Sequence, residues 1–505
     1  MKQILHIFAK DVRRLWPEIL ISLATLSAFV WIFPSEWGVR SVVLPQFRWL
    51  PGATVFLVIF GWLLMITRDI HGETLVGERQ FWITRPYRWP LLLGAKALFL
   101  FVFLLFPFFL VQLILLHIAG FPALPSLPGV AWNMLFLVAI AVVPMAAIAT
   151  MTSNFGRMLL GILFVILYIG LVAYIDSRLP TSGFADDYMG TLTSLVLLGV
   201  LITVIVLQYA QRRTGLSRLL TAGMALIIGL LTLFGPENLP MRLSYPSQAG
   251  SAAVSVDIAF KPEAKKSEDH PFVFDDKREI ALNVPLKIGG IQSRTAIRED
   301  YAKVEITSAS GERWVSHWQS IHSDWGPATT QASLGLKISN AFYERAKGKP
   351  VTASITLAMT ALEAGKTAYT TMPSGKLALA GGGTCSLSEW GGLSCLAPLR
   401  PPALMLAVVQ ASQSKCFQGE PRDDEGGYGE TWVGMPNPSV EFGLTPIWRS
   451  YINFQFRALD ENHRAYICAG APLSFTPYSV VWKGQRKVPI GVINLQDYAY
   501  RNTRY

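Results

Sequence analysis

Few side chains of this chain are arranged as catalysis or metal binding would require. His317, His322 and Asp324 are close in sequence, but two histidines five residues apart point to opposite faces of a strand, which disfavours a shared metal ion. The acidic run 423–425 lies among glycines and predicts a solvated loop. The sequence contains no HExxH, GxSxG or CxxC motif. We expect no catalytic residue and no metal site, so an envelope enzyme is the weakest of the functions considered.

A phosphate-binding loop is also not expected. Gly365, Lys366 and Thr367 come nearest to the GxxxxGK pattern, but Thr360 stands where the first glycine is required. We therefore expect no ATPase and no cofactor in this chain.

The four cysteines, Cys385, Cys395, Cys416 and Cys468, all lie in the second half of the chain. Disulfides persist in oxidising compartments and are rare in the cytosol, so this distribution predicts an extracytoplasmic location for that half. Four cysteines allow three pairings. We favour Cys385 with Cys395 and Cys416 with Cys468, and free buried thiols are the alternative.

Long apolar runs fill the first half of the 505-residue chain, which is 51% hydrophobic overall. A membrane span needs roughly 20 mainly apolar residues. The sequence predicts about seven, Trp16–Phe33, Gly52–Thr67, Ala97–Ala119, Val130–Met151, Met158–Ile175, Thr191–Ala210 and Leu219–Phe234. Pro107 and Pro144 fall inside two of them and predict kinks. Ionisable side chains are almost absent from the runs, which argues against a transporter driven by buried carboxylates.

The basic residues of the first half indicate the orientation of these spans. With the N-terminus in the cytoplasm, the inside segments hold Lys2, Lys10, Arg13, Arg14, Arg68, Arg79, Arg85, Arg88, Lys96, Arg157, Arg212, Arg213 and Arg218, and the outside loops hold Arg40, Arg48 and Arg178. This excess matches the positive-inside rule and suits an anionic lipid surface, not a nucleic acid. The first run could also be a signal peptide, but it ends in bulky residues without a cleavage pattern.

After the last span the periodicity changes to two. The sequence predicts strands at Ala253–Phe260, Glu279–Leu286, Ala302–Thr307, Val351–Leu357, Leu404–Val409, Ser439–Phe442 and Val480–Trp482, with one helix at Leu336–Ala346. Such spacing suggests a β-sandwich. The only asparagine in a sequon pattern, Asn437, is followed by proline, which favours a bacterial envelope over a eukaryotic secretory route.

The segment from Arg68 to Lys96, between the second and third runs, is the most informative part of the chain. If the first part of this segment is a helix, one of its faces carries Leu75, Val76, Trp82 and Ile83. Such a short amphipathic helix could lie on lipid or dock into a partner's groove.

This segment resembles the coupling loop of exporter-type ATP-binding-cassette permeases. The resemblance rests on acidic residues, then an aromatic residue, Thr-x-Pro, an apolar triplet and Gly-x-Lys before a span, and covers about residues 1–215. The first 15 residues, with Ile4, Leu5, Phe8, Val12 and Leu15 on one face, resemble the elbow helix of these permeases. The residues that the resemblance assigns to the loop are Glu73, Glu78, Phe81, Trp82, Arg85, Pro86 and Lys96.

The resemblance implies a permease that pairs with a second permease subunit and binds a cytosolic ATPase, which holds the ATP. Residues 1–15 would be a cytoplasmic amphipathic helix, 16–239 the α-helical membrane bundle and 240–505 an extracytoplasmic all-β sandwich-like domain. The inner membrane of a bacterium is the expected location. Two features depart from the family, which commonly has six spans and lacks so large an external domain. The alternative is a non-transporting anchor that displays an adhesive or sensory domain.

Overall fold

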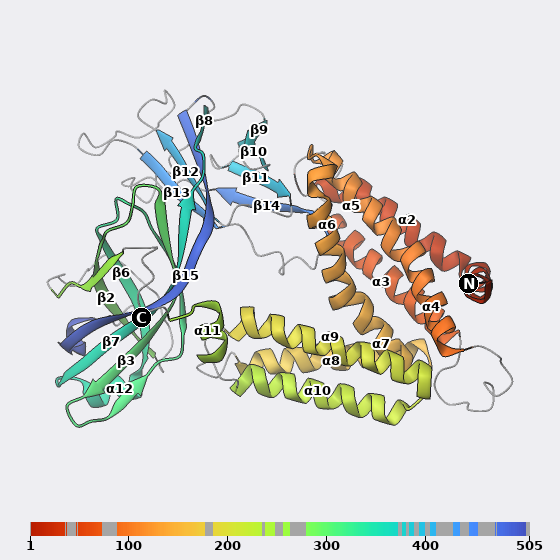
Figure 1. Cartoon of the computed structure of the whole chain (residues 1–505), viewed down its shortest axis with the longest axis horizontal. Helices are drawn as coiled ribbons and strands as arrows, with labels where there is room; N and C mark the ends of the chain where they lie inside the picture. The colour runs from red at the N-terminus through yellow and green to blue at the C-terminus, as the bar shows by residue number, and fades with distance from the viewer. Residues whose placement is uncertain are drawn as a thin grey trace.

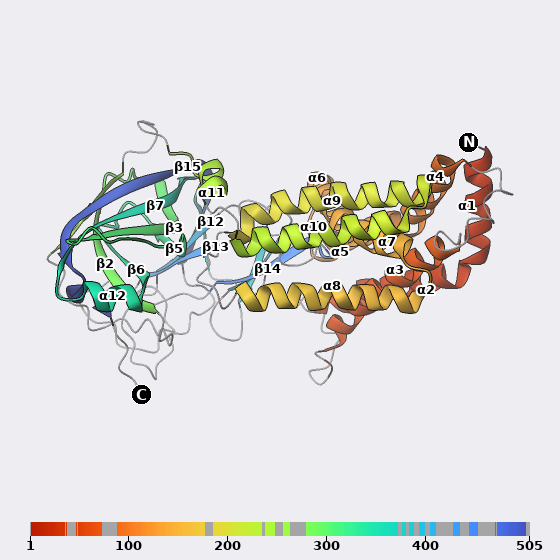
Figure 2. The ribbon, with the colours of Figure 1, turned by 90° about the horizontal axis from the view of Figure 1, so that it is seen from below.

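The chain forms a helical region followed by a β-rich region, and the two lie at opposite ends of an elongated molecule in this computed structural model (Figure 1). The N-terminus lies at the end remote from the strands (Figures 1 and 2). The structure describes residues 2–35, 37, 47, 49–72, 88–176, 185–234, 238–247, 256–262, 279–371, 376–379, 383–387, 393–398, 404–410, 428–434, 444–452, 470 and 472–500.

The long helices of the first region run back and forth between its two ends, and α1 lies across one of those ends (Figure 2). The helices of this region follow in chain order. They are α1 Lys2–Arg14, α2 Trp16–Ile32, α3 Leu50–His71, α4 Trp89–Leu100, α5 Phe106–Ile118, α6 Ala123–Leu137, α7 Val143–Met151, α8 Phe155–Asp176, α9 Ala185–Gln211, α10 Thr214–Phe234 and α11 Asn238–Ser244.

Within the described residues, six helical stretches are long and apolar enough to cross a membrane. They are Trp16–Ser35, Leu50–His71, Trp89–Ile118, Ala123–Met151, Phe155–Ile175 and Thr214–Leu233. The remaining expected run, Thr191–Ala210, falls in α9, whose described side chains form a shorter apolar helix, Leu195–Gln211. The bundle of about six long apolar helices is therefore confirmed, whereas the count of seven rests on α9.

The two helix-breaking prolines are accommodated without breaking their helices. Pro107 and Pro144 each follow a five-residue π-helical segment, Phe101–Leu105 and Val138–Val142. In these widened turns Phe106 N–H donates to the Phe101 carbonyl, and Val143 N–H to the Val138 carbonyl. A π-bulge makes room for the proline ring, so the expected kinks take the form of local unwinding inside continuous helices.

The strands of the second region form three antiparallel sheets. They are β1 Asp257–Phe260, β2 Glu279–Gly289, β3 Thr295–Ser308, β4 Arg313–Val315, β5 Gln319–Trp325, β6 Gln331–Ser339, β7 Pro350–Ala364, β8 Ala368–Thr371, β9 Lys376–Leu379, β10 Gly383–Leu387, β11 Leu393–Pro398, β12 Leu404–Gln410, β13 Tyr428–Gly434, β14 Ile447–Ile452, β15 Pro472–Asn494 and β16 Ala499–Tyr500. The largest sheet has the order β13-β12-β15-β7-β3-β4, with β5 on β3 and β8 on β15. The second is β1-β2-β16 with β6, and the third is β14-β11-β10-β9.

The first two sheets face each other across one hydrophobic core. Leu282 and Val284 of β2 pack in the same cluster as Val304 of β3 and Ile355 of β7. This layered arrangement agrees with the expected sandwich, because alternate residues of each strand point into the space between the layers.

The expected β-rich domain is confirmed, and the one helix predicted within it is present as α12, Asn340–Ala346, so the domain is not strictly all-β. The predicted start of that helix was wrong. Residues 336–339, predicted as helix, complete strand β6 instead. The strand expected at Ser439–Phe442 lies outside the described residues.

Candidate functional site

Helix α1 lies across the end of the helical bundle, roughly at right angles to the long helices (Figure 2). Its buried face is formed by Ile7 and Asp11, followed by Leu15 in the turn to α2. Leu5, a member of the predicted apolar face of this helix, is 54% exposed. A carboxylate therefore occupies the middle of an otherwise apolar contact.

Asp11 belongs to a buried ion triad with Asp69 and Lys96. The Lys96 Nζ atom lies 2.8 Å from Asp11 Oδ2 and 3.0 Å from Asp69 Oδ1. The three side chains come from α1, from the last turn of α3 and from the third turn of α4, and each is at most 3% exposed. One ammonium group thus joins three helices.

The triad fixes these helices to one another because each buried charge needs a partner of opposite sign on another helix. Removing one partner of a buried ion pair leaves an uncompensated charge, which typically costs about 3–5 kcal/mol. α4 can present Lys96 here because it begins at Trp89 with Pro90 in its first turn, a position that proline tolerates. The ion triad is consequently a specific attachment of α1 to the ends of α3 and α4.

Basic side chains at the same end of the bundle donate hydrogen bonds to the last carbonyl groups of α3 and α7. Arg14 Nη1 donates to the Gly72 carbonyl over 3.2 Å, and His71 Nε2 to the Ala149 carbonyl over 3.0 Å. Arg218 Nη2 of α10 donates to the Met151 carbonyl over 3.0 Å. The last carbonyls of a helix lack the usual i+4 donor, and the two arginine cations also interact favourably with the helix dipole. These bonds connect α3, α7 and α10 with α1.

The opposite end of the bundle contacts the β-rich domain. Gln112 of α5 is fully buried, and its Nε2 donates to the Leu444 carbonyl over 2.9 Å. Leu396 of β11 and Ile447 of β14 belong to the same hydrophobic cluster as the helices. The third sheet therefore packs directly on the bundle.

Most residues assigned to the coupling loop lie in segment 73–87, between α3 and α4. Six of them are outside the described residues, namely Glu73, Glu78, Phe81, Trp82, Arg85 and Pro86. The last member, Lys96, was expected in the loop but lies inside α4 and is buried. Its ammonium group holds α1 and α3, so this position was misassigned as a loop residue.

The ion triad was missed because its three members are far apart in sequence. Lys96 is 85 residues from Asp11 and 27 from Asp69. The available signal was local: each charge interrupts an otherwise apolar helix face, as Asp11 does between Ile7 and Leu15. An isolated charge on such a face requires a partner of opposite sign.

One predicted disulfide is confirmed. Cys385 of β10 and Cys395 of β11 stand directly opposite each other in the antiparallel ladder, with Cα atoms 4.0 Å apart, and are bonded. Cys416 and Cys468 lie outside the described residues, so their pairing stays a prediction.

The remaining sequence candidates do not form a site in the described residues. Residues 365–367 link strands β7 and β8, which both pair with β15, and the element that follows them is a strand and not the helix that a phosphate-binding loop requires. Asp324 pairs with Arg298 at 3.0 Å. The described histidine, cysteine and acidic side chains contain no cluster that could hold a metal ion.

A pair of buried carboxyl groups lies at a bulge of β3. Glu299 is fully buried on the core side, and no described group donates a hydrogen bond to either of its oxygens. Burial raises the pKa of Glu299 well above its ordinary value, and the negative charge of Asp300 adds a smaller increase. Asp300 accepts hydrogen bonds from the Tyr245 hydroxyl at 2.9 Å and the Thr360 hydroxyl at 2.5 Å. These contacts hold Tyr245, just after α11, against the large sheet.

Comparisons with known proteins leave the family of this chain open. No family model and no curated protein matches it. Among solved structures, red sea bream transglutaminase is similar over 48% of this chain and 31% of its own, at 11% identity and a TM-score of 0.13. So low a score carries no argument about fold or activity.

Proposed function

We propose that this chain is the membrane-spanning permease subunit of an ATP-driven ABC exporter, powered by a separate cytosolic ATPase. The observation that carries the proposal is the position of α1, which lies across the end of the bundle and is bound through the ion triad to α3 and α4. These two helices flank segment 73–87, the segment that resembles a coupling loop. A partner that moves this segment would move α1, α3 and α4 together.

Helix exposure and charge support the membrane location. α8 is apolar along its length and largely exposed, with Phe164 at 70% and Ile166 at 59%. In water such a surface would be unstable, whereas lipid tails or a second permease subunit would cover it. The described cations assigned to the cytoplasm belong to α1, the end of α3, the first turns of α4, the start of α8 and the turn from α9 to α10, and these helix ends lie toward the end of the bundle where α1 lies (Figure 1). The N-terminus would then be cytoplasmic in a bacterial inner membrane, and the disulfide-bearing domain extracytoplasmic.

The π-helical segments supply positions at which the bundle could change shape. Phe101–Leu105 and Val138–Val142 lie midway along two of the long helices, each beside a proline. Such segments are frequently functional, because the looser hydrogen bonding lets the two halves of a helix shift relative to each other. Energy for that movement would come from ATP bound by the partner, and this chain would need no cofactor of its own.

Affinity purification of the full-length protein in mild detergent tests the proposal. We expect a cytosolic ATPase of the ATP-binding-cassette type to co-purify, and Glu78→Ala or Trp82→Ala to reduce its recovery at least tenfold. Arg345→Ala, an exposed change in the β-rich domain, is the control and should leave recovery unchanged. Repeated purification without an ATPase, from cells that express its gene, would contradict the proposal.

A second candidate function is an anchor that displays the β-rich domain without transport. The contact between Gln112 and the Leu444 carbonyl favours this anchor function, because the third sheet packs directly on the bundle and is held in a fixed position. If the chain is such an anchor, the β-rich domain should bind its ligand equally well with and without an ATPase in the cell. Trp82→Ala should then leave ligand binding unchanged.

A further inference from the structure

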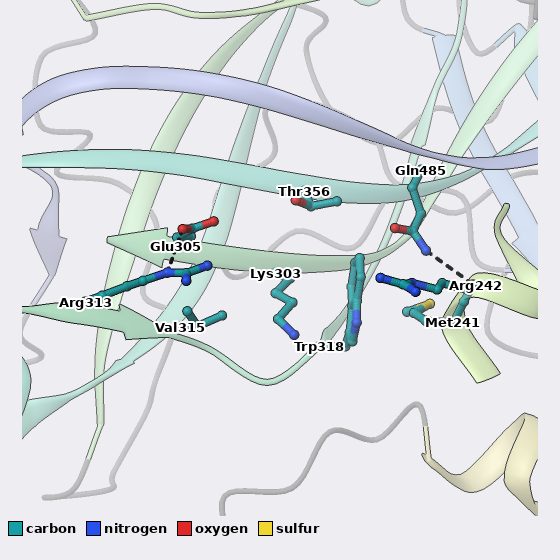
Figure 3. A pocket seen from close by; sticks show the side chains of 9 residues that line it. All are labelled: Met241, Arg242, Lys303, Glu305, Arg313, Val315, Trp318, Thr356 and Gln485. Atoms are coloured by element: carbon teal, nitrogen blue, oxygen red, sulfur yellow. Dashed lines mark hydrogen bonds and ion pairs between the residues drawn. The ribbon is translucent and has the colours of Figure 1, made fainter. Parts of the chain in front are cut away.

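A pocket of about 240 Å³ lies where α11 meets the outer face of the largest sheet, and nothing proposed above uses it. It is lined by Met241, Arg242, Lys303, Glu305, Arg313, Val315, Trp318, Thr356 and Gln485. These residues come from α11, from β3, β4, β7 and β15, and from the turn before β5 (Figure 3). A pocket of this size is far larger than a single water needs and can hold a phosphate group.

The lining is strongly basic. Arg242, Lys303 and Arg313 provide three positive charges, and Glu305 is the one acid among the nine lining residues. Glu305 is already shared, since Arg313 Nε lies 2.8 Å from its Oε1 and Lys487 Nζ lies 3.3 Å from its Oε2. The three cations and the one carboxylate of the lining leave it a net charge of +2, which attracts an anion.

One wall of the pocket is aromatic and rigid. Trp318 is 3% exposed and packs with Met241 and Tyr301 beneath α11. The Lys303 ammonium lies 5.8 Å from the centre of its ring, and in Figure 3 Arg242 lies on the other side of that ring. Gln485 Nε2 donates to the Met241 carbonyl over 3.2 Å and so ties α11 to β15. The cations of α11 and β3 are thus held around a fixed surface.

We propose that this pocket binds a phosphate group, and that its source is the headgroup of an anionic phospholipid. Arginine recognises phosphate through paired N–H donors, and lysine adds a point charge. The choice of lipid follows from the position of the pocket, because α11 begins only four residues after the end of the apolar helix α10. Leu243 of α11 is 59% exposed beside the pocket, as a helix that rests on a lipid surface requires. The site does not depend on transport.

Native mass spectrometry of the full-length protein in detergent tests the site, with phosphatidylglycerol, phosphatidylcholine and glycerol 3-phosphate as probes. We expect phosphatidylglycerol to bind at least tenfold more tightly than phosphatidylcholine. Arg242→Gln and Arg313→Gln should each weaken its binding about tenfold, since each loses a charged hydrogen bond. Arg345→Gln, which removes an exposed arginine outside the pocket that pairs with Glu312 at 2.8 Å as Arg313 pairs with Glu305, is the matched control and should have no effect.

A change that strengthens binding excludes the explanation that the variants merely unfold. Glu305→Gln removes the one acid of the pocket and should tighten phosphatidylglycerol binding severalfold. Equal binding of phosphatidylglycerol to the native protein and to the Arg242, Arg313 and Glu305 variants would overturn the site. If glycerol 3-phosphate binds as tightly as phosphatidylglycerol, the pocket takes a soluble phosphate ester and the lipid source is overturned.

Discussion

Replacing Lys96 by glutamine should release α1 from the bundle. The change leaves Asp11 and Asp69 as two buried carboxylates without their shared ammonium group, 2.8 and 3.0 Å away in the native protein. Breaking a buried pair in this way costs about 3–5 kcal/mol. If the whole helical region unfolds as one unit, the loss should lower Tm by about 6–20 °C, at 2–4 °C per kcal/mol.

Hydrogen–deuterium exchange distinguishes global destabilisation from local release of α1. If α1 detaches locally, the amides of Lys2–Arg14 should exchange at least a hundredfold faster in Lys96→Gln while those of α5 stay protected. Arg68→Gln is the control, because it breaks the more exposed pair between Arg68 and Glu18, worth at most about 1 kcal/mol.

A neutral version of the triad provides the decisive comparison. Asp11→Asn, Asp69→Asn and Lys96→Gln together remove all three charges and keep groups that can hydrogen-bond. We expect this triple variant to be more stable than Lys96→Gln alone, because no charge is left buried. Native Tm and native exchange of α1 in Lys96→Gln would refute the reasoning.

Three further predictions concern the β-rich domain and its contact with the bundle. Glu299→Met should stabilise the domain at pH 7 by about 1–3 kcal/mol, since it removes a buried carboxyl that lacks a donor. Burial raises the pKa of Glu299, so the free energy by which this carboxyl destabilises the folded domain grows as pH rises from about 4 toward its folded-state pKa. The increase in Tm caused by Glu299→Met should therefore be larger at pH 7 than at pH 4, and an equal increase at both would contradict the prediction. Cys385→Ala with Cys395→Ala should cost about 3 kcal/mol by the loop-entropy estimate, measured by urea unfolding of the oxidised protein against the double variant, and an unchanged midpoint would show that the bond adds nothing. Gln112→Leu leaves the Leu444 carbonyl without its buried donor and should cost about 1–3 kcal/mol in thermal stability, whereas no loss would show that this contact is dispensable.

Sequence patterns predicted the apolar helices and several strands well, because long apolar runs and alternating apolar residues are local signals. The longest strand, β15, was expected only at Val480–Trp482 but extends from Pro472 to Asn494. The six long apolar helices and the strands β2, β7 and β12 lie where hydrophobicity placed them. The Cys385–Cys395 bridge also followed from a short spacing. Local sequence carries enough information for such features.

Features that depend on contacts between distant segments were not predictable in the same way. Strand β3 was expected from Ala302 but begins at Thr295, since the carboxyl pair Glu299 and Asp300 interrupts the apolar alternation at a bulge. Residues 336–339 read as helix but pair with β2, because tertiary pairing overrides a weak local preference. The charges of the triad gave no hint of their partners, since pairing across 85 residues is set by the packing of α1 on α4.

The most direct test of the proposed function is photo-crosslinking from position 82 in intact cells. A photoreactive amino acid replaces Trp82 in the segment between α3 and α4, and the cross-linked products are identified by mass spectrometry. The account predicts a cross-link to a cytosolic ATP-binding-cassette ATPase, lost when the label is moved to position 345 in the β-rich domain. Cross-links from position 82 to lipid or envelope proteins alone, in cells that contain the ATPase, would contradict it.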